Sequence, residues 1–98
     1  MAKIKTMKIK QSELWNLDIT LAEYILPRLI AFRKMKRTGV PMNFKSIKEW
    51  NKELDKMIYA FNKIVNLDNI EEDYLRYEKP KVKEGLKSFS DNFGALWD

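Results

Sequence analysis

Hydrophobic positions recur at helical spacing in three segments of this 98-residue chain. The clearest segment spans 46–66, where Ser46-Ile47-Lys48-Glu49 forms a capping-box motif that favours a helix start. Behind it, the apolar positions follow a 3.6-residue period: Ile47, Trp50, Leu54, Met57, Ile58, Phe61, Ile64 and Val65. This pattern predicts an amphipathic helix over 46–66.

A second helix is predicted over 18–37, with Asp18 as N-cap, Gly39 just past the end and Pro41 preventing continuation. Its apolar positions form two adjacent stripes and a further flank. The first stripe is Leu21, Ala22, Ile25, Leu29 and Phe32, and the second is Ile19, Leu26 and Ile30. The flank is Tyr24, Ala31 and Met35. Pro27 lies on the narrow polar strip and predicts a kink there. A helix with so broad an apolar surface is expected to be central to the domain or part of a subunit interface.

A third helix is predicted over 80–94, because Pro80 suits a first helical turn. Its narrow apolar stripe comprises Val82, Leu86, Phe89, Phe93, Leu96 and Trp97. Residues 67–79 are acidic and predict a loop, with a short element at 74–78. The predicted fold is therefore all-α: a three-helix domain over 12–98, with the 18–37 helix kinked and central, the 46–66 helix antiparallel to it and the third across both. Residues 1–11 form a basic N-terminal arm or an edge strand.

Composition excludes several classes of chemistry. The chain has no cysteine and no histidine, which removes the commonest catalytic bases, nucleophiles and transition-metal ligands. The acidic run Asp68 to Asp73 lacks the glycine turn and oxygen spacing of a calcium loop. No glycine-rich phosphate loop is present. We therefore expect a non-enzymatic protein with no cofactor and no metal site.

Nothing in the chain predicts a membrane protein. No apolar run reaches the roughly 18 residues of a membrane span, since Glu23 and Arg28 interrupt the longest one. The first residues, Met-Ala-Lys-Ile-Lys, lack the apolar core of a secretion signal. We expect a cytoplasmic protein.

The sharpest candidate pair is Arg28 and Asp55, each beside an apolar stripe on a different predicted helix. An unpaired charge in such a place is costly, and a mutual ion pair resolves both. The pair is interpreted as a bridge that sets helix register or, alternatively, as a guanidinium that awaits an anionic ligand. Asn51 and Asn62 continue the polar row that contains Asp55.

The net charge is +5, and one cationic cluster, Arg33, Lys34, Lys36 and Arg37, closes the 18–37 helix. These residues either complement the negative end of the helix dipole or contact phosphates. Trp15, Trp50 and Trp97 are interpreted as core or hinge packing rather than as stacking platforms. Because the second apolar stripe of the 18–37 helix exceeds what two other helices can cover, we expect a homodimer or higher assembly.

The sequence resembles a family of small uncharacterised proteins encoded by tailed bacteriophages. The resemblance spans roughly 15–98 and rests on five motifs: Trp15-Asn16-Leu17-Asp18, Thr20-Leu21-Ala22 with Ile25-Leu26-Pro27-Arg28-Leu29, Gly39-Val40-Pro41, Trp50 with Leu54 to Phe61, and Glu84-Gly85-Leu86 with Phe89, Phe93 and Leu96-Trp97-Asp98. It implies a short cytoplasmic protein made during infection and carries over no activity.

Three functions compete for such a chain. The first is binding to a host factor, such as a defence component, which the protein modulates or inhibits. The second is binding to nucleotides or nucleic acid through Arg28 or the basic cluster. The third is a role as a small structural or assembly component of the virion. The first is preferred, with a host protein as partner.

Overall fold

The computed structural model describes residues 8–37, 39–66 and 75–97. Its elements are α1 (Ser12–Trp15), α2 (Leu17–Lys34), α3 (Ile47–Val65), η1 (Arg76–Glu78), α5 (Pro80–Asp91) and η2 (Phe93–Ala95). Three helices of substantial length, α2, α3 and α5, build the domain, and the predicted all-α class is confirmed. The arm prediction falls largely on residues outside the described ranges; residues 8–10 have no regular secondary structure.

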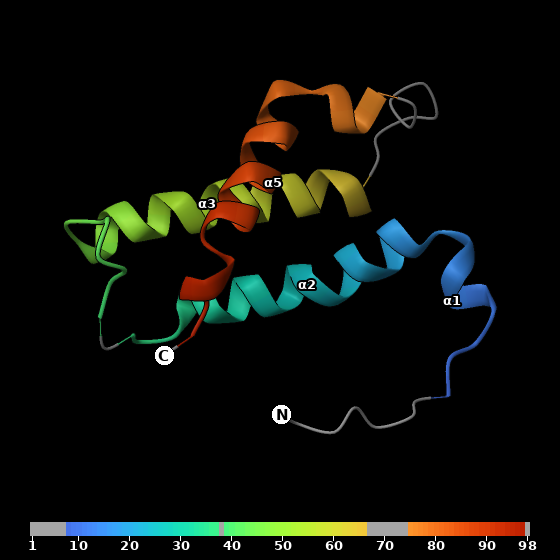
Figure 1. The fold of residues 1–98 in the computed structure, drawn as a ribbon, viewed down its shortest axis with the longest axis horizontal. Coiled ribbons are helices and arrows are strands. Elements are labelled where there is room, and N and C mark those ends of the chain that lie inside the picture. Colours follow the sequence, from blue (N-terminus) through green and yellow to red (C-terminus); the bar gives the residue numbers. More distant parts are fainter. Residues whose placement is uncertain (1–7, 38, 67–74, 98) are drawn as a thin grey trace.

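Helix α3 lies between the other two long helices (Figure 1). It contributes most of the buried core, namely Trp50, Leu54, Met57, Ala60, Phe61 and Ile64, whereas α2 contributes Ala22 and Leu29 and α5 contributes Val82. Both α2 and α5 pack on α3, but no Cα atom of α2 lies within 8 Å of a Cα atom of α5. The prediction that the C-terminal helix crosses both others is therefore wrong. Of the two other long helices, it packs on α3 alone.

The helix ends show which local signals act as predicted. Ser46 is the N-cap of α3 and its Oγ accepts a hydrogen bond from the Glu49 backbone N–H at 3.2 Å. Glu49 Oε2 reciprocates by accepting the Lys45 backbone N–H at 2.7 Å. At α2, however, the N-cap position belongs to Asn16, and Asp18 is the second helical residue. The Asp18 cap prediction is therefore wrong.

Helix α2 continues through Pro27 but ends at Lys34, three residues before the predicted end. Met35 takes an extended conformation, with φ −73° and ψ 154°, so the helix stops there without a glycine. Pro27 and Glu23 are both exposed, as expected for a proline that frees a backbone carbonyl toward solvent. Residues 35–37 therefore leave the helix and run toward the start of α3 (Figure 1).

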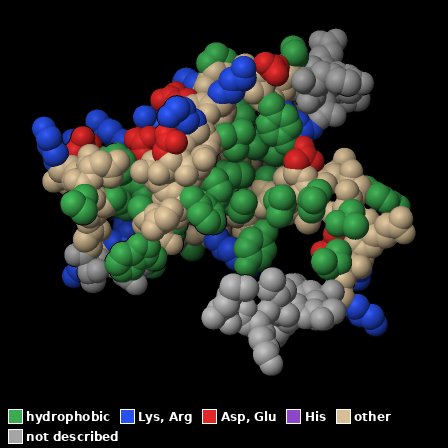
Figure 2. Space-filling view, viewed as in Figure 1, with side chains coloured by type: hydrophobic (Ala, Val, Ile, Leu, Met, Phe, Trp, Pro, Cys, Tyr) green, Lys and Arg blue, Asp and Glu red, His purple; other side chains and the backbone are tan. Residues whose placement is uncertain are grey.

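The apolar side chains of α2 are divided between buried and exposed positions differently from the predicted stripes. Ala22 and Leu29 are buried against α3, and Ile19, Leu26 and Ile30 are half-buried. The large side chains left in solvent come instead from the opposite flank: Leu17, Leu21 and Tyr24. Figure 2 shows hydrophobic side chains gathered between α2 and α5 and around α1 on this face of the molecule.

Candidate functional site

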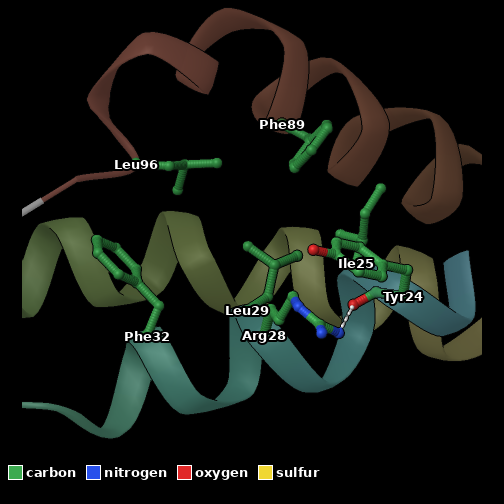
Figure 3. A pocket seen from close by; sticks show the side chains of 7 residues that line it. All are labelled: Tyr24, Ile25, Arg28, Leu29, Phe32, Phe89 and Leu96. Carbon is green, nitrogen blue, oxygen red and sulfur yellow. Dashed lines mark hydrogen bonds between the residues drawn. The ribbon is translucent and has the colours of Figure 1, made fainter. Parts of the chain in front are cut away.

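A groove lies between α2 and α5, and α3, on which both helices pack, forms the layer beneath it. The groove encloses about 250 Å³. Five of its lining residues belong to α2, one to α5 and one to the segment after η2: Tyr24, Ile25, Arg28, Leu29, Phe32, Phe89 and Leu96. Phe89 and Leu96 point into the groove from one wall and Phe32, Leu29 and Ile25 from the other (Figure 3). The groove exists because α2 and α5 each contact α3 and leave a gap between themselves.

The groove walls are held firmly on the α5 side by aromatic contacts. Phe89 packs edge-to-face on Phe61 of the core, with ring centroids 5.0 Å apart, and on Phe93, with centroids 5.4 Å apart. Such pairs add about 0.5–1.5 kcal/mol beyond the area they bury. The wall is therefore set by the core itself, and the groove is largely formed before anything enters it.

One charged group lies at the mouth of this groove. The Arg28 guanidinium stacks 3.6 Å from the centroid of the Tyr24 ring, and its Nη1 donates a hydrogen bond to the Tyr24 carbonyl oxygen at 2.9 Å. Both side chains are exposed. A guanidinium has five N–H donors, so most of the Arg28 donors remain available to an acceptor from outside. The groove thus offers apolar walls with one cation at the edge.

The predicted ion pair between Arg28 and Asp55 is wrong. Asp55 Oδ1 instead accepts a hydrogen bond from Arg33 Nε at 3.0 Å, which joins α3 to α2. The reason is the angular position on α2: Arg33 lies one turn after buried Leu29 and so projects toward α3, whereas Arg28 projects away from it.

The predicted basic cluster is divided by the end of α2. Arg37 bridges the two helices: its Nη2 donates to Asn51 Oδ1 of α3, and its Nη1 donates to the Phe32 carbonyl oxygen of α2 at 3.4 Å. Lys34 and Lys36 remain exposed. Asn62 accepts from Asn66 Nδ2 at 2.6 Å on the exposed side of α3. Of the candidate residues, Arg33 with Asp55 and Arg37 with Asn51 are brought together, and both pairs link α3 to the C-terminal end of α2.

Arg76 is a residue that the sequence analysis did not select. It is only 8% exposed and donates from Nη1 to the Ile64 carbonyl oxygen at 3.2 Å. Beside it, Tyr77 Oη donates to Asp18 Oδ2 at 2.5 Å, which joins η1 to the start of α2. The signal available in the sequence was an arginine placed between two apolar residues, Leu75 and Tyr77, within an acidic segment.

The contact between Tyr77 and Asp18 shifts the acidity of both groups. The hydrogen bond from Tyr77 lowers the pKa of Asp18 below its usual 3.8. Burial, followed by the bond to the Asp18 carboxylate, raises the pKa of Tyr77 to about 12. Both shifts favour the hydrogen-bonded pair at neutral pH, so this contact is a structural link between η1 and the start of α2.

The tryptophan prediction holds for one residue of three. Trp50 is 1% exposed and stacks on Phe44 with ring centroids 5.2 Å apart. Trp15 and Trp97 are each 75% exposed, so their assignment to core or hinge packing is wrong. Both lie beyond the ends of the long helices, where no second layer of helix covers them.

Within residues 8–37, 39–66 and 75–97, no group of three or more acidic side chains is placed to hold a metal ion. None of the described helices is both long and apolar enough to cross a membrane. Comparisons with protein-family models, with curated proteins and with solved structures give no match. The groove between α2 and α5 is the candidate site because it combines apolar walls with the Arg28 guanidinium at its mouth.

Proposed function

We propose that this chain is a non-enzymatic accessory protein of a bacteriophage that binds a host protein in the groove between α2 and α5. The groove carries the proposal, because six of its seven lining residues are apolar or aromatic. Apolar grooves between helices are the usual receptors for amphipathic segments of partner proteins. The phage origin and the location in the host cytoplasm rest on the family resemblance of residues 15–98.

The chemistry of the groove defines the partner segment. Ile25, Leu29 and Phe89 favour aliphatic or aromatic side chains at helical spacing. Arg28 favours a carboxylate at the edge of that segment, because a bidentate pair with a guanidinium is strong and directional. We therefore expect an amphipathic helix of the host protein, with an acidic residue beside its apolar face. Inhibition of a defence or regulatory component is the preferred consequence.

The intrachain pairs disfavour a nucleic-acid function. Arg33 already binds Asp55, and Arg37 already binds Asn51, so the predicted cluster does not present four cations on one surface. A complex held by apolar contacts weakens little with salt, whereas phosphate contacts weaken steeply. Binding to the captured partner at 50 and 200 mM salt separates these functions.

The test is site-specific photo-crosslinking in infected cells. A benzophenone amino acid is placed at Leu96, inside the groove, and in a matched protein at Met42, an exposed apolar position remote from it. We expect one host protein to be crosslinked from position 96 and not from position 42, and Arg28→Ala to reduce its yield several-fold. Equal crosslinking from both positions, or crosslinking only to virion proteins, would overturn the proposal.

A further inference from the structure

The outer face of α2 carries a second pattern, which shares only Tyr24 and Arg28 with the groove. Six positions spaced alternately by four and three residues lie on one line along the helix: Leu17, Leu21, Tyr24, Arg28, Ala31 and Met35. All six are exposed, and Leu21 and Tyr24 are 52% and 60% exposed. This is the spacing of a coiled-coil seam. It lies opposite the face that packs on α3, so no described element covers it.

Two further apolar clusters lie at opposite ends of this line. Helix α1, which contains Leu14 and Trp15, lies beyond the first turn of α2, and the C-terminal segment from η2 onward, which contains Phe93 and Trp97, lies toward the other end of α2 (Figure 1). All four side chains are more than half exposed. A two-fold axis perpendicular to α2 places the N-terminal end of α2 in one copy beside the C-terminal end of α2 in a second copy. It therefore brings the end of one copy that carries Leu14 and Trp15 to the end of the second copy that carries Phe93 and Trp97.

The charges along α2 select the same arrangement. Asp18 and Glu23 lie in its N-terminal half, whereas the cations Lys34 and Lys36 lie at or just past its C-terminal end. Glu23 makes no ion pair with any residue in the described ranges. Two antiparallel copies of α2 place acidic halves beside basic halves, and their helix dipoles also oppose each other. Two parallel copies would place like charges together.

We propose that this chain forms a two-fold symmetric dimer in which the Leu17, Leu21, Tyr24, Arg28, Ala31 and Met35 face of α2 packs antiparallel on the same face of a second copy. The seam centre falls between Tyr24 and Arg28, so Arg28 of each copy lies beside Tyr24 of the other. The partner is thus a second copy of this chain, and the contact is isologous. Tyr24 and Arg28 also line the groove, whereas Leu17 and Leu21 do not, so a change at Leu21 tests the dimer without altering a groove residue.

The first test is the molar mass by light scattering at 5 to 100 µM. The chain mass is 11.7 kDa, and we expect twice that value at the upper concentrations. Leu21→Glu is expected to restore the single-chain mass, while Met42→Glu, an apolar-to-acid change at a fully exposed position outside the seam, leaves the dimer intact. Circular dichroism melting confirms that both variants fold. A single-chain mass for the unmodified protein at 100 µM would overturn the proposal.

The second test reports the orientation and exploits the absence of cysteine from the chain. Thr20→Cys and Lys34→Cys proteins, one of them carrying a mass tag, are mixed and oxidised. We expect the mixed disulfide between the two variants to exceed either self-disulfide at least several-fold, because an antiparallel pair brings residue 20 of one copy near residue 34 of the other. Dominant self-disulfides would show a parallel pair and overturn the antiparallel arrangement. A monomeric protein that still crosslinks its host partner from position 96 would leave the proposed function standing.

Discussion

Gly85 of α5 packs directly against Ala60 of α3: a Cβ atom added to Gly85 would lie 2.5 Å from the Ala60 Cβ atom. It would lie still closer to the backbone carbonyl oxygen of Lys56. The two helices approach this closely because each presents a residue with little or no side chain at the crossing. Gly85 thereby brings α5 down onto the core, which positions Phe89 as a groove wall.

Gly85→Ala is expected to destabilise the protein by about 1–3 kcal/mol, since the obstructing atoms include backbone that must shift. For a domain of this size, 1 kcal/mol corresponds to roughly 4–8 °C in the melting temperature. Thermal melting measures the effect. Gly94→Ala is the control, because a Cβ there meets nothing within 4 Å, and its melting temperature should remain within a few degrees. Equal stability of the two variants would contradict the close crossing.

Asp55 is expected to couple energetically to Arg33 and not to Arg28. The Arg33–Asp55 pair is partly exposed, with 35% and 57% of the side chains accessible, so solvent screening limits its value. A double-mutant cycle with Arg33→Ala and Asp55→Ala should give a coupling free energy of about 0.2–1 kcal/mol. The same cycle with Arg28→Ala should give about zero by the same measure. A larger coupling free energy for Arg28 with Asp55 than for Arg33 with Asp55 would favour the ion pair predicted from the sequence.

Tyr77→Phe is expected to reduce stability by roughly 0.5–1 kcal/mol at neutral pH, through loss of the hydrogen bond to Asp18. This difference should be pH-dependent at both ends. The pKa of Asp18 is lowered in the folded state, so the contribution is present above pH 3.8 and is lost as the pH falls through the folded value. The pKa of Tyr77 is raised from 10.0 to about 12, so its contribution is complete below pH 10 and is lost as the pH rises toward 12.

Urea unfolding of the unmodified protein and of Tyr77→Phe at several pH values measures this difference. The two curves of unfolding free energy against pH should be furthest apart between pH 4 and 10 and should converge outside that range. The many lysines titrate identically in both proteins, so subtraction removes their effect. A difference that stays constant from pH 3 to pH 12 would argue against the contact.

Ser46→Ala is expected to destabilise the protein by about 1 kcal/mol, because the N-terminal turn of α3 loses its side-chain acceptor for the Glu49 N–H. Ser90→Ala serves as the comparison. Ser90 is exposed within α5, where alanine is slightly preferred, so that variant should be as stable as the original or slightly more stable. Chemical denaturation of both variants decides the matter; comparable losses would mean that the Ser46 cap contributes nothing.

The amino-acid sequence alone determined the features that depend on neighbouring residues. The 3.6-residue period of α3, its Ser46 cap and the proline start of α5 are local signals, because a helix satisfies its backbone within the same segment. The excess of apolar surface on α2 was also visible in the sequence. It follows from counting positions around a single helix and requires no knowledge of the neighbouring helices.

Tertiary packing decided which side of each helix faces another. Arg28 and Arg33 both border apolar positions on α2, and only the docking of α2 on α3 through Ala22 and Leu29 assigns Asp55 to Arg33. The same docking leaves Leu21 and Tyr24 in solvent and opens the groove, since α5 approaches α3 at Gly85 while its Cα atoms stay more than 8 Å from those of α2. The sequence pattern of one helix does not fix its rotation about its own axis relative to its neighbours. Only contacts between distant segments select that rotation.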